Sequence, residues 1–212
     1  MYISVDVYEE MYLENKGADT VFSEVNKLRR EIARLKNKME SPTYTVDSKK
    51  VPSDLETVGI YREYLLRAES VLSQITGDLG VLDEERKSAL YFDSNIESVV
   101  CLTLTIGRYF EHKYELRFSD LGAKIFELHL GEEPTSRDVD ENYVKAAILS
   151  LHLGEWSDVY TPEKYGCNLS EPVKWQLRVD FDNGAAPRYF DGRGVFPYNF
   201  SIVEKLFAID II

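Results

Sequence analysis

Two stretches near the N-terminus repeat apolar residues at alternating spacings of three and four. The first comprises Val21, Val25, Leu28, Ile32, Leu35 and Met39, and the second comprises Val58, Tyr61, Leu65, Ala68, Leu72 and Ile75. This heptad pattern predicts two helices, each with a narrow apolar stripe on an otherwise charged surface. Because such a stripe is unstable in water, another helix must cover it. The N-terminal part of the chain is therefore expected to fold by pairing helices.

The heptad pattern leaves open which helix is the partner. In the first stretch, β-branched residues at most a positions and leucine at two d positions favour a parallel two-stranded coiled coil. The linker to the second stretch, Ser41–Pro52, is short, and connected helices are usually neighbours. We therefore expect a helical hairpin within one chain, with a homodimer through the helices as the alternative. In either arrangement the candidate contact residues are Val25, Leu28, Ile32 and Leu35.

Local signals set the boundaries of these two helices. The first is expected over residues 19–39, because the serine and proline that follow disfavour helical backbone. The second is expected to begin with a capping box made by Ser53 and Glu56. It should end at Gly77, since glycine readily adopts the left-handed conformation that closes a helix.

The flanking segments complete the first part of the chain and begin the second. Tyr2–Tyr8 alternates apolar and polar residues, which predicts a short strand, with an extended arm as the alternative. Asp83 is expected to cap a third helix over Glu84–Leu90. We therefore divide the chain into a helical unit, residues 1–80, and a second unit, residues 81–212.

The second unit reads as an antiparallel sheet with packed helices. Predicted strands cover Val99–Ile106, Tyr114–Phe118, Lys124–Leu130, Val173–Asp182 and Pro187–Phe190, the last two joined by a two-residue turn at Asn183-Gly184. Helices are expected from Asp140, with apolar positions Val144, Ala147, Ile148, Leu151 and then Trp156 or Val159, and over Ser201–Ala208. The order β-β-β-α-β-β-α predicts an α+β fold that follows an N-terminal, coiled-coil-like helical hairpin.

Several aromatic and glycine residues of the second unit form a recognisable signature. Its elements are Glu155-Trp156, Trp175-x-Leu177, Asn183-Gly184, Tyr189-x-x-Gly192 and Phe196-Pro197-x-Asn199-Phe200. Through these residues, the region of about residues 95–210 resembles an uncharacterised domain that recurs in proteins of Gram-positive bacteria and their mobile elements. The resemblance implies a fold unit, with no known activity. Independently of it, alternation along Val173–Asp182 predicts that Trp175, Leu177, Val179 and Phe181 belong to the core.

Charge constrains the class of partner. The chain has a net charge of −12, of which residues 1–80 carry −3 and residues 81–212 carry −9. An acidic unit repels phosphate backbones, so direct binding of nucleic acid is not expected. The basic residues between Lys27 and Lys38 are interpreted as a solvated helix face or a dock for the acidic unit.

No sequence motif indicates catalysis. His112, His129 and His152 lie in three different predicted elements, outside any metal-binding or nucleophile motif. Cys101 and Cys167 are interpreted as reduced thiols. We therefore expect no catalytic residues, no metal and no cofactor, with a site assembled in space from histidines and carboxylates as the enzymatic alternative.

The sequence favours a non-enzymatic, cytoplasmic protein–protein interaction module. Its helices would pair or dimerise, and its acidic second unit would bind a protein partner through Arg188, Asp191, Arg193 and Tyr198. No apolar run is long enough to span a bilayer, and no secretory signal is visible, so no membrane contact is expected. The alternative is an anti-defence inhibitor of the anti-CRISPR type encoded by phages, which occupies the basic channel of a nucleic-acid-binding protein.

Overall fold

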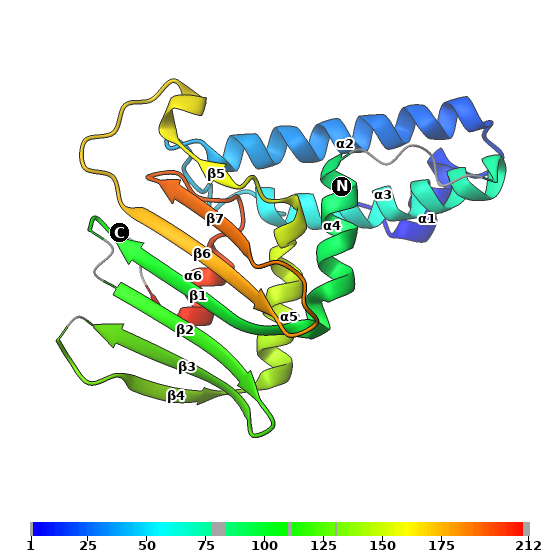
Figure 1. The fold of residues 1–212 in the computed structure, drawn as a ribbon. Helices are drawn as coiled ribbons and strands as arrows, with labels where there is room; N and C mark the ends of the chain where they lie inside the picture. Colours follow the sequence, from blue (N-terminus) through cyan, green and yellow to red (C-terminus); the bar gives the residue numbers. More distant parts are fainter. Residues whose placement is uncertain (1, 78–83, 110–111, 130, 210–212) are drawn as a thin grey trace. The chain divides into compact units, whose positions relative to one another are not determined.

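The computed structural model describes residues 2–77, 84–109, 112–129 and 131–209. It divides the chain into two compact units, Met1–Leu82 and Asp83–Ile212 (Figure 1). The predicted boundary after residue 80 and the predicted cap Asp83 lie outside the described residues.

The first unit begins with a helix, α1 (Val5–Tyr12), so the predicted N-terminal strand is wrong. Ser4 caps the helix by accepting a hydrogen bond from the Val7 amide at 3.3 Å. Tyr8 is buried, and its ring stacks on that of Tyr64 with the centroids 4.1 Å apart. Alternation over so few residues is weak evidence for a strand, and the prediction did not consider that Ser4 could cap a helix or that Tyr8 could be buried on one helical face.

Two long helices form the predicted hairpin within one chain. α2 (Ala18–Glu40) packs against α3 (Asp54–Thr76). Both halves of the predicted capping box are present, with the Glu56 amide donating to the Ser53 side chain and the Ser53 amide donating to Glu56. Gly77 ends α3 in the left-handed region at φ 69°. The signals at both ends of α3 are therefore confirmed.

The apolar stripe of α2 is more completely buried than that of α3. Val21, Val25, Leu28, Ile32 and Leu35 are buried, and Met39 is half-buried. On α3, Val58 and Ala68 are buried, whereas Ile75 is exposed. Tyr64, which lies off the predicted stripe, is buried because α1 packs on another side of α3.

The second unit has the predicted α+β fold, and it is built on a seven-stranded sheet. The strands are β1 (Val99–Gly107), β2 (His112–Ser119), β3 (Gly122–His129), β4 (Thr135–Val139), β5 (Val159–Tyr160), β6 (Lys174–Phe181) and β7 (Arg188–Arg193), in the order β4-β3-β2-β1-β6-β7-β5. All neighbours are antiparallel except β5 and β7. The meander β1-β2-β3 is confirmed, whereas β4 and β5 are additions at the two edges of the sheet.

Helical segments complete the second unit. They are α4 (Glu84–Asn95), α5 (Glu141–Leu151), α6 (Ser201–Phe207) and the short 3-10 helices η1 (Ile96–Ser98), η2 (Leu153–Glu155) and η3 (Pro162–Tyr165). α5 and α6 lie behind the sheet in Figure 1, and the rings of Phe207 and Tyr114 are 5.9 Å apart. Asp140 caps α5 as expected for the start of this helix. We call the side of the sheet that these helices pack against the covered face.

Two details of the predicted second unit are wrong. α5 ends at Leu151, where His152 adopts a positive φ, so Trp156 and Val159 lie beyond the helix. β6 and β7 are joined by residues 182–187 rather than by the two-residue turn at Asn183-Gly184. Pro187 has no amide hydrogen for the ladder, which explains why pairing begins only at Arg188.

Candidate functional site

The four heptad residues predicted to bind a partner are occupied within the hairpin. Val25, Leu28, Ile32 and Leu35 are all buried in the first unit. Their apolar surface stabilises the contact between α2 and α3, and the described first unit does not present them to another molecule.

The basic residues of α2 also have partners inside the first unit. Lys27 pairs with Glu24 at 3.0 Å, and Arg29 pairs with Glu69 on α3 at 3.0 Å. Arg34 pairs with Glu31 one turn away, at 2.9 Å. Lys36 is buried, so only part of this basic stretch is a solvated helix face.

A buried carboxylate at the start of α3 holds the connection between the two long helices. Asp54 accepts hydrogen bonds from Lys38 Nζ at 2.7 Å and from the Tyr44 hydroxyl at 3.1 Å, and also from Lys50 Nζ. Burial acts to raise the pKa of Asp54, but these three donors outweigh it and lower the pKa to about 2. The network therefore stabilises the hairpin.

The second predicted set of binding residues is divided between different environments. Arg188 pairs with Asp158 at 3.2 Å and lies on the covered side of β7. Asp191 and Arg193 are exposed on the opposite side, and Arg193 pairs with Glu163. Tyr198 is buried. The structure therefore does not bring these four side chains together into one surface.

The aromatic signature forms the core behind the sheet. Trp156, Trp175 and Phe200 contact one another, with ring centroids 5.0–6.2 Å apart. The Trp175 indole nitrogen donates to the Val195 carbonyl at 2.8 Å, and Gly192 lies so close that a Cβ there would be 2.4 Å from this nitrogen. The signature glycine is thus required by the tryptophan, and both have structural roles.

Asn199, the signature asparagine, joins this core to the end of α5. Its side-chain oxygen accepts from the Trp156 indole nitrogen at 3.0 Å. Its amide nitrogen donates to the carbonyl of Leu151 at 2.7 Å and to that of Ser150 at 3.3 Å. The side chain is buried and binds two helix-end carbonyls that lack helical donors.

The structure brings together two of the three histidines. His112 and His129 face each other across β2 and β3, with ring centroids 5.4 Å apart, and His129 Nε2 lies 3.0 Å from Glu127 Oε1. His152 lies elsewhere, at the end of α5. No group of three or more histidine, cysteine, aspartate or glutamate residues in the described part of the chain could hold a metal ion.

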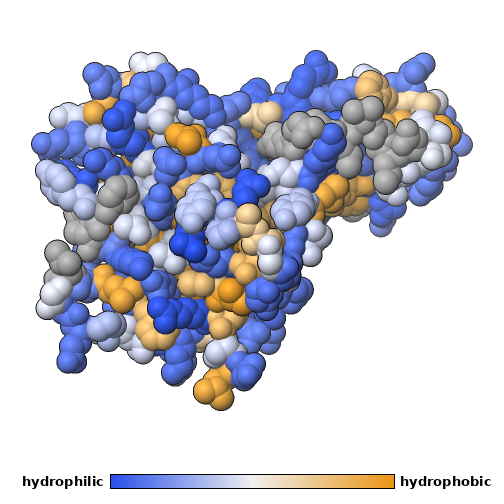
Figure 2. All heavy atoms as spheres, in the orientation of Figure 1, coloured by the Kyte–Doolittle hydropathy of each residue, from blue (hydrophilic) through white to orange (hydrophobic). Residues whose placement is uncertain are grey.

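The side of the sheet opposite the covered face is a surface whose residues follow from the strand register. We call it the open sheet face, because α5 and α6 lie on the opposite side (Figure 1). Its residues are Cys101, Thr103, Thr105, Lys113, Glu115, Arg117, Lys124, Phe126, Leu128, Ser136, Asp138, Lys174, Gln176, Arg178, Asp180, Tyr189, Asp191 and Arg193. Figure 2 shows mostly hydrophilic side chains over the sheet, with hydrophobic ones between them.

The open sheet face has a charge opposite to that of its unit. It carries six basic residues and four acidic ones, whereas residues 81–212 have a net charge of −9. The arginines also reach farther into solvent than the acids that hold them. The Arg117 side chain is 56% exposed and that of Glu115 is 11% exposed, while Arg178 is 46% exposed and Asp180 is 23% exposed. The face therefore presents cationic groups outward.

Two arginines of this face are held in place on both sides. The Arg117 guanidinium lies 4.8 Å from the centre of the Phe126 ring, and that of Arg178 lies 5.5 Å from the centre of the Tyr189 ring. Arg117 Nε donates to Glu115 Oε2 at 2.9 Å, and Arg178 Nε donates to Asp180 Oδ1 at 2.9 Å. Burial acts to raise the pKa of Glu115, but hydrogen bonds from Lys113 and Arg117 hold it below its ordinary value. Glu115 therefore stays ionised beneath the two cations.

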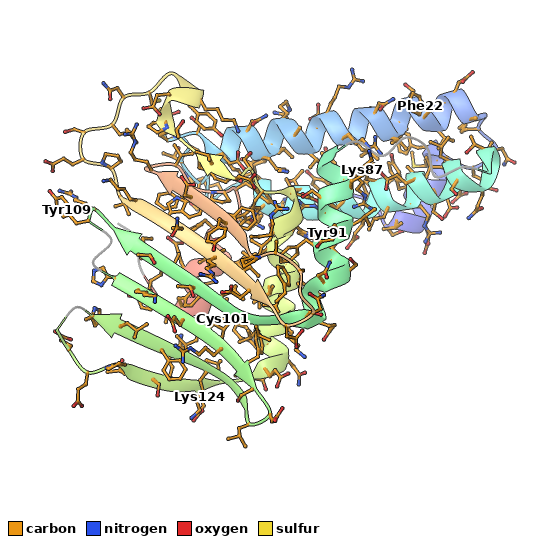
Figure 3. All side chains as sticks on the ribbon, viewed as in Figure 1. Phe22, Lys87, Tyr91, Cys101, Tyr109 and Lys124 are labelled. Atoms are coloured by element: carbon orange, nitrogen blue, oxygen red, sulfur yellow. The ribbon has the colours of Figure 1, made fainter. Side chains whose placement is uncertain are left out.

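The central strand between these arginines carries short side chains. Cys101, labelled in Figure 3 together with Lys124, and Thr103 lie on the open sheet face of β1. Burial raises the pKa of the Cys101 thiol, which also lies 3.7 Å from the Thr103 hydroxyl. A protonated thiol is a weak nucleophile.

Apart from Asp191 and Arg193, the residues of the open sheet face were missed as a site by sequence reasoning. Alternation along β6 identified Arg178 and Asp180 as the solvated side of a strand. Their placement beside Cys101 and Arg117 follows from the pairing of β1 with both β2 and β6. The polar alternation was a signal for each strand, but only the strand order shows that the strands share one surface.

Comparison of the chain with protein-family models, with curated proteins and with solved structures gives no match. None of the helices in the described part of the chain combines the length and apolar character that a membrane crossing requires. The fold class and the open sheet face are therefore the basis for a functional proposal.

Proposed function

We propose that this protein is a non-enzymatic protein–protein interaction module that binds its partner through the open sheet face of the second unit. The helical hairpin uses its apolar stripe within the chain, which moves the expected partner contact away from Val25, Leu28, Ile32 and Leu35. Of the predicted residues in the second unit, Asp191 and Arg193 remain part of the proposed surface.

The observation that carries this proposal is the pair of arginines fixed on the sheet. Arginine and aromatic residues supply much of the binding energy at protein interfaces. Arg117 and Arg178 are each fixed by a carboxylate below and an aromatic ring beside them. Because these side chains are already ordered, a partner would lose little additional entropy in binding them.

The charge balance of the face supports one of the two protein-binding hypotheses over the other. An inhibitor that occupies a basic nucleic-acid channel needs acidic residues on its contact surface. The open sheet face has more basic than acidic residues, so we do not assign it to such an inhibitor. The free thiols of Cys101 and Cys167 support a reducing compartment, and we propose a cytoplasmic partner.

The proposal is tested by blocking the face and measuring the loss of a partner. Thr103→Trp places a large side chain at the centre of the open sheet face, and Thr135→Trp places the same group on the exposed strand β4, in register with the covered face. The full chain and both variants are used for quantitative affinity capture from the cells that naturally produce the protein. We expect Thr103→Trp to lose a protein that the wild type and Thr135→Trp retain. Equal recovery with all three would refute the assignment of the face.

A further inference from the structure

We propose that the open sheet face recognises an extended, acidic segment of the partner protein, which lies along β1 and places carboxylates against Arg117 and Arg178. This inference rests on the proposed function and specifies the chemistry of its partner.

The first argument is the distance over which charges act. The net charge of −9 on residues 81–212 opposes a densely charged polyanion such as a nucleic acid. A short acidic segment bound on the face responds mainly to nearby groups, because charges are screened over about 8 Å at physiological ionic strength. On the open sheet face, six basic side chains outnumber four acidic ones. The face therefore complements an acidic peptide better than it complements a nucleic acid.

The second argument is the hydrogen-bonding capacity of the arginines. A guanidinium has five N–H donors. The hydrogen bonds of Arg117 to Glu115 use its Nε and Nη2 atoms, and those of Arg178 to Asp180 use the same two atoms. Each arginine thus keeps donors on Nη1 while its orientation is fixed. Carboxylates are the groups that a guanidinium binds most specifically, since the two planar groups match in geometry.

The third argument is the spacing of the strands. Arg117 on β2 is directly opposite Cys101 on β1, and Arg178 on β6 is directly opposite Thr103. Neighbouring strands are about 4.8 Å apart, so β2 and β6 are separated by about 10 Å. The side chains of β1 on this face are short, whereas those of β2 and β6 on either side are longer. An extended segment between them would meet one arginine on each side.

The test uses fluorescein-labelled dodecapeptides in which serine alternates with glutamate, lysine or glutamine, together with a single-stranded thymidine oligonucleotide of the same length. Binding to the full chain is measured by fluorescence anisotropy at several salt concentrations. The test variant is Arg117→Gln/Arg178→Gln. The matched control, Lys87→Gln/Lys205→Gln, removes the same charge from exposed positions on α4 and α6.

We expect the glutamate peptide to bind more tightly than the other three probes, and its affinity to fall as salt rises. The arginine variant should bind it about tenfold more weakly, whereas the control should stay within about twofold of the wild type. Tryptophan fluorescence confirms that both variants are folded. Preference for the oligonucleotide, or equal affinity for the acidic and basic peptides, would overturn the inference.

Amide chemical-shift mapping with the glutamate peptide provides a second readout that does not depend on the variants. Shifts should concentrate on β1, β2 and β6. Shifts confined to α2 and α3 would overturn the inference. If the glutamate peptide does not bind but Thr103→Trp still fails to capture the partner, the proposed function stands and only the chemistry assigned to the partner is wrong.

Discussion

Replacing Asn199 with leucine tests the account of the signature as a structural core. The substitution keeps a side chain of similar volume but removes the bonds to the Trp156 indole nitrogen and to the carbonyls of Leu151 and Ser150. Leaving one buried donor unsatisfied costs about 1–3 kcal/mol, and losing the bond to a helix-end carbonyl adds about 1 kcal/mol. We therefore expect Asn199→Leu to lower the free energy of unfolding by about 3 kcal/mol.

The assay is urea unfolding of the full chain followed by tryptophan fluorescence. The chain has two tryptophans, and both lie in the buried core of the second unit, so this signal reports on that unit. Asn142→Leu, at an exposed position on α5, is the matched control and should change the free energy of unfolding by less than about 0.5 kcal/mol. If Asn199→Leu were as stable as this control, the buried hydrogen bonds would not hold the signature together.

Three further predictions concern the two cores. Trp175→Ala should cost about 3–5 kcal/mol, measured by urea unfolding with Trp156 as the fluorescent probe. Asp54→Asn should destabilise the hairpin by about 2 kcal/mol at neutral pH. Because the pKa of Asp54 is lowered to about 2, the difference in stability between wild type and variant should shrink as pH falls from about 4 towards 2. The NMR signals of α2 and α3 during urea unfolding measure this difference. Leu28→Asp/Ile32→Asp should reduce helicity in circular dichroism, since burying each apolar side chain contributes about 1.5–3 kcal/mol; retained helicity would contradict the role of the stripe.

The sequence predicted those parts of the fold that local residues determine. The capping box of Ser53 and Glu56 and the left-handed Gly77 define the ends of α3 through hydrogen bonds within a few residues. The apolar alternation of β6 likewise identified Trp175, Leu177 and Val179 as buried residues, whereas Phe181 at the end of the strand is only half-buried. These signals depend on residues that are close together in the sequence, so they can be recognised without knowledge of tertiary contacts.

Features that depend on tertiary contacts were missed. The strand predicted at Tyr2–Tyr8 is a helix because Tyr8 packs on Tyr64, which is distant in the sequence. The strand β4 is exposed and polar, so it lacks the apolar alternation that reveals a strand. Its position at the sheet edge follows from its pairing with β3.

The candidate site was predictable only in part for the same reason. Arg178 was predicted to lie on the solvated side of its strand, and Arg193 was predicted to be a partner-binding residue beyond the last strand. The surface they share with Arg117 exists because β6 pairs with β1, which also pairs with β2. Alternation assigns each residue to one side of its own strand, but it does not say which strands are neighbours.

Site-specific photo-crosslinking tests most directly whether the open sheet face binds the partner. A benzophenone amino acid is placed at Thr103 or at Thr135 in the full chain, in the cells that produce it, and the adducts are identified by mass spectrometry. We predict a protein adduct from position 103 that is absent from position 135, with the crosslinked peptide rich in aspartate or glutamate. An adduct that forms equally from both positions, or from position 135 alone, would contradict the account.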